Sequence, residues 1–180
     1  MTMDIPRPPL KGRKALVVGI ANEFSIAWGC AKAFRELGAE LAITYINEKT
    51  KTYVEPLAKE LEAPIFMPLD VAVSGQLEAV FEMIGRKWGE LDILVHSIAF
   101  APKADLQGPL LACSADGFKQ AMDISCHSFV RMARLAVPLM KDGRNCARRS
   151  HATSLDCEHR AGNERRRAEG ARAQVHQRSD

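Results

Sequence analysis

A glycine-led loop is the part of this sequence whose residue types and spacing are best suited to chemistry. The chain reads Gly-Ile-Ala-Asn-Glu-Phe-Ser-Ile-Ala-Trp-Gly from Gly19 to Gly29, directly after an apolar run at residues 15–18. Gly19 allows a tight turn out of a strand, the N–H groups from Ser25 onward form an open helix N-terminus, and Gly29 allows that helix to lie close to the strand. The sequence therefore predicts a site for the pyrophosphate of a dinucleotide. An ordinary strand-turn-helix corner is the alternative, because the middle glycine of G-x-G-x-x-G is absent.

Strands and helices that could position this loop alternate along the chain up to Gly143. Continuous apolar runs predict strands that are covered on both faces, and amphipathic segments predict the helices between them. The expected strands are 14–19, 41–45, 64–69 and 91–96, and the expected helices are 25–37, 48–62 with an interruption at Pro56, 74–88 and 115–140. Right-handed crossovers then give an α/β fold, the N-terminal half of a Rossmann-like, doubly wound parallel sheet with strand order 3-2-1-4.

Several details of the helices are specific enough to be checked. Ser25 is placed as the N-cap of the first helix and Gly38 as its stop. The third helix has an apolar face formed by Leu77, Val80, Phe81 and Ile84. The long helix at 115–140 has Pro138 near its end and an apolar stripe that we expect to be buried: Phe118, Met122, Phe129, Met132, Ala133, Val137 and Met140.

The glycine-led loop resembles that of the bacterial-type NADH-dependent enoyl-acyl carrier protein reductases, a divergent branch of the short-chain dehydrogenase/reductase superfamily. Three further segments are similar to this family in the same order: Asp70 and Val71 after the third strand, residues 96–102 after the fourth, and residues 123–129 in the next helix. The resemblance covers about residues 7–143. It implies an oxidoreductase of fatty acid biosynthesis that uses NADH to reduce a 2-enoyl thioester carried by acyl carrier protein.

The resemblance also implies which residues contact NAD. They are Gly19, Ser25, Ile26, Ile46, Asp70, Val71 and Ile98, with the backbone of Ala101 facing the acyl substrate. The Ser25 hydroxyl would hold a phosphate oxygen, and the Asp70 carboxylate with the neighbouring N–H would match the edge of adenine. The alternative for Asp70 is an aspartate that caps the turn after a strand.

The residues after the second strand favour NADH over NADPH. They read Tyr45, Ile46, Asn47 and Glu48, with no arginine to bind a 2′-phosphate. Ile46 stands where the family commonly has glutamine, so Asn47 is the adjacent group able to form a hydrogen bond with the ribose.

The histidines and cysteines predict neither a catalytic group nor a metal site. His96 at a strand end and His127 in the long helix each lack a partner acid at a defined spacing, so we expect a hydrogen-bonded structural role. The five cysteines are odd in number and show no C-x-x-C spacing, which favours reduced thiols. A zinc site formed by Cys146, His151, Cys157 and His159 does not fit the usual ligand spacing.

The catalytic residues of the family have no counterpart in this sequence, so we assign none. Enoyl reduction there uses a tyrosine and a lysine six or seven residues later, whereas this chain has only Tyr45 and Tyr53 and no lysine after Lys141. Agreement with the family ends at Gly143 and gives way to an arginine-rich sequence, as expected of a truncated or frameshifted version. The alternative is a nonenzymatic nucleotide-binding or interaction fragment.

The chain has two regions of different composition, one on each side of the point where agreement with the family ends. Residues 1–143 hold 16 Lys and Arg against 17 Asp and Glu and form the predicted NAD-binding half-domain. Residues 144–180 hold nine Arg, no Lys and five acids, with so few apolar residues that disorder is expected. The interleaved acids and the lack of Phe, Tyr and Trp argue against a nucleic-acid-binding arm.

Overall composition gives the broad class. The net charge is +3, with 47% hydrophobic and 26% charged residues, as is ordinary for a globular protein. Neither a membrane span nor a secretory signal is apparent, so a cytoplasmic location is expected. Complete members of the family form homo-oligomers, but we do not carry that expectation over to this chain.

Overall fold

A four-stranded parallel sheet organises the computed structural model, which describes residues 8–140. The strand order is β3-β2-β1-β4, as predicted from the crossovers. The strands are β1 (Lys14–Val18), β2 (Glu40–Tyr45), β3 (Ile65–Pro68) and β4 (Ile93–His96). Val18 is level with His96, and Tyr45 is level with Pro68, so the carboxyl ends of the strands form one edge of the sheet.

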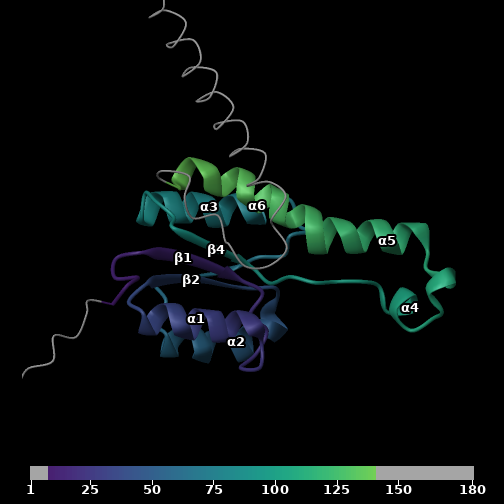
Figure 1. Ribbon diagram of the computed structural model, residues 1–180, viewed down its shortest axis with the longest axis horizontal. Helices are drawn as coiled ribbons and strands as arrows, with labels where there is room; N and C mark the ends of the chain where they lie inside the picture. Colours follow the sequence, from purple (N-terminus) through teal and green to yellow (C-terminus); the bar gives the residue numbers. More distant parts are fainter. Residues whose placement is uncertain (1–7, 141–180) are drawn as a thin grey trace, which may run out of the picture. The chain divides into compact units, whose positions relative to one another are not determined.

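Helices cover both faces of the sheet (Figure 1). One face carries α1 (Ile26–Glu36) and α2 (Glu48–Glu60), and the other carries α3 (Gln76–Lys87) and α6 (Ser128–Ala136). Successive side chains of a strand point to opposite faces. In β1, Ala15 and Val17 accordingly pack toward α1 and α2, whereas Leu16 and Val18 pack toward α3 and α6. The predicted apolar face of α3 is buried at all four positions.

The first helix has the predicted start and stop. Ser25 is the N-cap residue, and Gly38 follows the helix with φ +95°, a conformation that glycine adopts without steric cost. The N–H of Gly38 donates to the carbonyl of Arg35 and that of Ala39 to the carbonyl of Phe34, which closes the helix end. The expectation for Gly29 was wrong: a Cβ there would meet nothing within 4 Å, because Gly29 lies on the exposed side of the helix.

The second helix runs through Pro56 without the expected interruption. Pro56 is exposed, so water can satisfy the carbonyl that lost its N–H partner. Val54 and Ala58 on the other side of the helix are buried and hold it against the sheet. Its N-cap is Asn47, whose side-chain oxygen accepts from the Thr50 N–H at 2.9 Å.

The segment between β4 and the predicted long helix, to which the sequence assigns no strand or helix, has local helical structure. It contains α4 (Lys103–Leu106) and the 3₁₀ turn η1 (Leu110–Ala112). The predicted long helix consists of four consecutive elements. It begins as α5 (Ala115–Met122), which is followed by the π-turn η2 (Asp123–His127). It continues as α6 and ends in the 3₁₀ turn η3 (Val137–Leu139), which contains Pro138.

The predicted apolar stripe of this helical run is buried over only part of its length. Met132 is fully buried, and Phe129 and Met140 pack against the same core. Phe118, Met122 and Val137 are exposed instead. For the first two the reason is visible in Figure 1, where α5 extends beyond the side of the sheet that α6 covers.

Three expectations lie partly or wholly outside the described residues. The boundary at residues 143 and 144 and the tail at 144–180 fall there, as do all four residues of the zinc site that the ligand spacing argues against. None of the helices within residues 8–140 has the length and hydropathy that a membrane span needs.

Candidate nucleotide-binding site

The predicted cofactor residues follow the carboxyl ends of all four strands. Gly19 comes directly after β1, Ile46 after β2, Asp70 two residues after β3, and Ile98 two residues after β4. In an open parallel sheet, ligands bind at this edge, where the strand order reverses. Here the reversal lies between β1 and β4, since the chain builds β2 and β3 to one side of β1 and then crosses to the other.

Gly19 is required by the geometry at this reversal. Its φ is +108°, and a Cβ built on it would lie 2.0 Å from the carbonyl oxygen of Ser97. No other residue fits there without moving the backbone, because the overlap is with main chain. The prediction of a tight turn at Gly19 is confirmed, and the turn brings the loop after β1 against the loop after β4.

The loop between Gly19 and α1 is organised by one hydroxyl. Ser25 Oγ accepts from the N–H groups of Ala21 and Asn22 at 3.0 and 3.1 Å and donates to Asn22 Oδ1 at 3.4 Å. The side chain therefore faces back into the loop and does not cap α1. Within the described residues, the N–H groups of Ile26 and Ala27 have no hydrogen-bond partner. Two backbone donors at a helix N-terminus are thus left for an anion.

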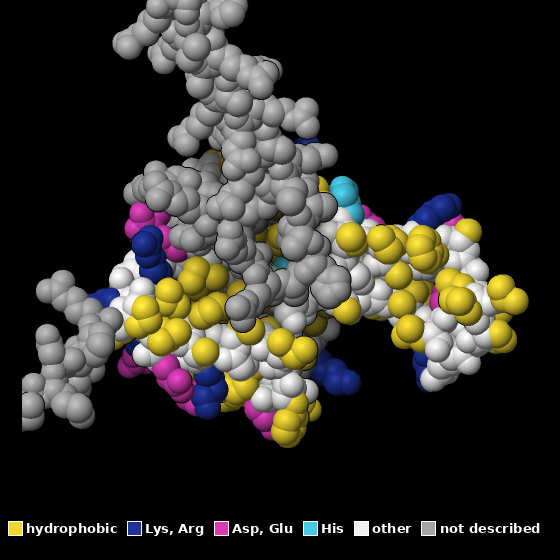
Figure 2. All heavy atoms as spheres, viewed as in Figure 1, with side chains coloured by type: hydrophobic (Ala, Val, Ile, Leu, Met, Phe, Trp, Pro, Cys, Tyr) yellow, Lys and Arg dark blue, Asp and Glu magenta, His cyan; other side chains and the backbone are white. Residues whose placement is uncertain are grey.

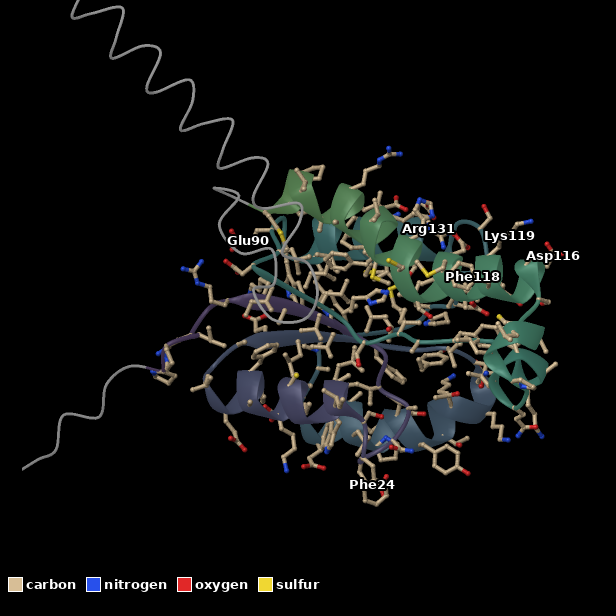
Figure 3. The ribbon with its side chains drawn as sticks, turned by 45° about the vertical axis from the view of Figure 1, so that its right-hand side comes forward. Phe24, Glu90, Asp116, Phe118, Lys119 and Arg131 are labelled. Carbon is tan, nitrogen blue, oxygen red and sulfur yellow. The ribbon has the colours of Figure 1, made fainter. Side chains whose placement is uncertain are left out.

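Apolar side chains surround these donors. Ile26 is 82% exposed at the start of α1. Phe24 is 85% exposed and points away from the rest of the molecule in Figure 3. Neither side chain contributes to the core, so the loop presents apolar surface next to an open helix end.

Asp70 forms the turn that follows β3. Its Oδ1 accepts from the Ala72 N–H at 2.9 Å, and its own N–H donates to Oε1 of Gln76 at 2.7 Å. The turn-capping alternative is therefore present in the structure, while Oδ2 has no hydrogen bond among the described residues. The Val71 side chain is buried in the core, so only its backbone could face a ligand.

The end of β2 offers less polar contact than expected. Ile46 is half-exposed, and the Asn47 side-chain oxygen accepts from both the N–H and the hydroxyl of Thr50. The oxygen of Asn47 is therefore already used by the cap of α2. A cavity of about 530 Å³ lies beside it, lined by Ala21, Asn22, Glu23, Phe24, Asn47, Lys49, Thr50 and Tyr53. Its lining includes Asn47 but none of the seven residues that the resemblance assigns to NAD.

His96 is hydrogen-bonded within the fold, as expected of a structural histidine. Its Nε2 lies 2.7 Å from Ser128 Oγ, and that hydroxyl donates its proton to the Ile124 carbonyl at 2.6 Å. Because a serine hydroxyl has one proton, Ser128 accepts from His96, and the histidine carries its proton on Nε2. Burial lowers the pKa of His96 below its ordinary value of 6.5. The expectation that His127 lacks a partner acid was wrong: His127 is exposed, and its Nδ1 lies 3.0 Å from Oδ1 of Asp123, four residues earlier in the helical run.

The loop after β4 is fixed from the π-turn. Phe100 donates its N–H to Ser125 Oγ at 2.9 Å, and Ser125 Oγ donates to the Phe100 carbonyl at 3.1 Å. Ile98 packs partly against the core beneath this loop, and Ala101 is half-buried. The segment predicted to face the nicotinamide and the substrate thus has a defined backbone position.

Sequence reasoning did not assign Gln76 or Ser125 to the site. Gln76 fixes the Asp70 backbone, and Ser125 fixes the Phe100 backbone. No local sequence pattern indicates either contact. The Gln76 contact spans six residues across a turn, and the Ser125 contact joins segments 25 residues apart. The similarity of residues 123–129 to the family was the one available signal for Ser125.

The fold and this edge define a Rossmann-like α/β domain, the class whose members bind dinucleotides where the strand order reverses. The sequence pattern of the enoyl-(acyl carrier protein) reductases matches residues 19–175. This match spans most of the chain, and the chain belongs to that family.

Individual relatives agree with the family assignment. The chain is 43% identical over 138 residues to the enoyl-(acyl-carrier-protein) reductase (NADH) FabI of Aquifex aeolicus, which covers 77% of this chain and 51% of that protein. It is 45% identical over 139 residues to the FabI enzyme of Neisseria meningitidis serogroup B, covering 77% and 53%. The chain therefore spans about half the length of the curated relatives it matches.

Solved structures show the same relation. The crystal structure of the Aquifex aeolicus NADH enzyme matches with a TM-score of 0.72 and 40% identity, over 76% of this chain and 54% of that one. The reductase of Anaplasma phagocytophilum, solved in complex with NAD, matches with a TM-score of 0.69 and 40% identity, over 72% and 50%. The predictions of family and fold are confirmed.

Proposed function

We propose that this chain is the dinucleotide-binding part of an NADH-dependent enoyl-acyl carrier protein reductase of fatty acid biosynthesis. The observation that carries the proposal is the corner at Gly19, whose backbone meets Ser97 and leads into an uncapped helix N-terminus. Relatives at about 40% identity include an enzyme solved with NAD. The complete reaction acts on a 2-enoyl thioester carried by acyl carrier protein, with NADH supplying the hydride.

Each strand end has a part in the proposed binding mode. The free N–H groups of Ile26 and Ala27, at the positive end of the α1 dipole, would hold the pyrophosphate. The unpaired Oδ2 of Asp70 would accept from the adenine amino group. Gly19, Ser25, Ile46, Val71 and Ile98 would shape the remaining contacts, and Ala101 would face the acyl substrate.

The tyrosines that the chain does have do not suit catalysis. Tyr45 is buried in the core against Phe66, with ring centroids 4.8 Å apart, and Tyr53 lies on α2. Tyr45 lies in β2 and Tyr53 in the helix that follows it, and β1 separates β2 from β4 and the loop that contains Ala101. We therefore infer that this chain binds the cofactor without completing enoyl reduction. A lost oxyanion donor alone commonly lowers kcat by about 100-fold or more.

The change of composition after Gly143 belongs to the same proposal. We divide the chain into a half-domain at 1–143 and a tail of different composition at 144–180, which we attribute to a change of reading frame, although the family pattern matches as far as residue 175. Sequencing the encoding DNA tests this directly. Another frame after codon 143 should encode the missing tyrosine and lysine with the family spacing, and their absence from every frame would contradict the frameshift.

Calorimetry of the full chain tests the binding proposal. Without a lysine on the nicotinamide ribose, NADH and ADP should bind within roughly tenfold of each other, a difference of about 1.4 kcal/mol. Asp70→Ala should weaken both ligands, whereas Asp116→Ala, at an exposed position on α5, should weaken neither. Tight binding selective for the nicotinamide, or NADH-dependent turnover that Asp70→Ala abolishes, would overturn the proposal.

A nonenzymatic interaction role is the second candidate, and the surface of one part of the chain favours it. Apolar side chains gather over α4, η1 and α5 in Figure 2. Leu106, Leu110, Leu111 and Phe118 are all exposed there, and Leu111 is 99% exposed. A chain that binds no nucleotide but associates through this surface would support the second candidate. Replacing Leu110 and Leu111 by serine would then abolish the association.

A further inference from the structure

The loop at residues 97–101 is held at both ends by contacts from distant parts of the chain. At one end, the Ser97 carbonyl lies against Gly19, which admits no side chain. At the other, both backbone groups of Phe100 are hydrogen-bonded to the single hydroxyl of Ser125. Ile98, between these two points, packs partly against the core. The loop has no regular secondary structure, so these contacts set its conformation.

Ser125 lies in the π-turn η2. A π-turn adds a residue to a helical turn, and such turns are frequent at functional sites. Two serines of this region contact the end of β4 and the loop that follows it. Ser128 is fully buried and binds His96, while Ser125 is half-buried and binds Phe100. The helical run therefore fixes the end of β4 and the loop beyond it through separate hydroxyl groups.

The two serines differ in what their loss would cost. Ser128 is buried between two partners, so removing its hydroxyl would leave polar atoms of the core unpaired. The Ser125 hydrogen bonds lie near the surface, where water can replace them, so they add little to stability. What Ser125 supplies is a fixed direction for the Phe100 backbone. That direction matters for a loop that contacts a ligand.

We propose that Ser125 is a positioning residue that holds the loop at residues 97–101 in the conformation that receives the nicotinamide end of NADH. This inference rests on the proposed function, because it assumes that the dinucleotide extends from Gly19 along the carboxyl edge to Ile98. The adenine end would lie beside Asp70, on the other side of β1. The binding of ADP is therefore independent of Ser125.

Hydrogen exchange and calorimetry on Ser125→Ala test the proposal. The Phe100 amide should exchange faster by about tenfold, the factor that corresponds to one lost hydrogen bond. NADH should bind more weakly by up to about tenfold, and ADP should bind as before. Ser125→Thr keeps the hydroxyl and should restore both values. Cys126→Ala, at an exposed position of the same turn, is the matched control and should change neither.

Each result of these two measurements either supports or overturns the positioning role of Ser125. Unchanged exchange at Phe100 overturns the clamp itself. The Phe100 amide could also exchange faster while the binding of NADH and ADP weakens equally, or while neither weakens. That result overturns the positioning role and leaves the proposed function intact. If the unaltered chain binds neither nucleotide, the proposed function fails together with the positioning role, and the Phe100 amide still reports whether Ser125 fixes the loop.

Discussion

At the scale of single residues, the site depends on backbone groups more than on side chains. Gly19 matters because it has no side chain, and Ile26 and Ala27 matter through their N–H groups. The hydroxyl of Ser25 is directed to the loop backbone, where it accepts from the N–H groups of Ala21 and Asn22. Substitutions here should act through the conformation of the loop.

Alanine at Gly19 should destabilise the chain, whereas alanine at Gly29 should not. The first would have to adopt φ +108° and would overlap the Ser97 carbonyl, which should cost more than about 1 kcal/mol. The second faces open space inside a helix, where alanine is favoured by roughly 0.5–1 kcal/mol. Urea denaturation of both variants measures the difference. Equal stability of the two would show that the turn at Gly19 is not as tight as described.

The buried histidine should make stability depend on pH. Burial lowers the pKa of folded His96, so between that value and 6.5 the unfolded chain binds more protons than the folded one. Stability should therefore fall as the pH drops below 6.5 and level off below the folded pKa. His96→Gln retains a donor for Ser128 and does not titrate, so its stability should vary less over this window.

At the scale of elements, sequence periodicity predicted the parts that pack against the sheet. The four strands, the helices at α1 and α3 and the stop at Gly38 follow from local patterns of apolar residues and glycine. The same patterns failed where a neighbour was needed to define the environment. Pro56 was tolerated because it faces solvent, and Phe118 is exposed because α5 extends past the sheet. The clamp at Ser125 could not be predicted because it depends on the placement of two distant segments.

The strand β4 should be a point of weakness. Within the described residues it pairs with β1 alone, so one side of an apolar strand carries unpaired N–H and C=O groups. An open edge of this kind recruits other chains. Size-exclusion chromatography should show association that increases with concentration. Hydrogen exchange at residues 93–95 of the monomer should be faster than in β1, the central strand that serves as the internal reference.

The same two measurements can contradict the prediction that β4 has an open edge. A sharp monomer peak, together with exchange across residues 93–95 as slow as in β1, would mean that another part of the chain covers β4. The region after Gly143 would then have a structural role that its composition does not indicate.

At the scale of the whole molecule, the chain has the fold of its solved relatives over about half of their length. The sheet order, the Gly19 corner and the family match all support the proposed dinucleotide site at the carboxyl edge. The matched relatives extend to about twice the aligned length. Binding and catalysis are therefore separate questions for this chain, and binding is the one its described residues address.

Hydrogen exchange of the full chain with and without saturating NADH tests the location of the site most directly. Exchange should slow at residues 19–28, 70–72 and 97–101, which lie at the carboxyl edge of the sheet. It should stay unchanged at residues 12–14 and 90–92, at the opposite edge. Slower exchange at the opposite edge, or only around Lys49 and Tyr53 beside the cavity on α2, would contradict the account.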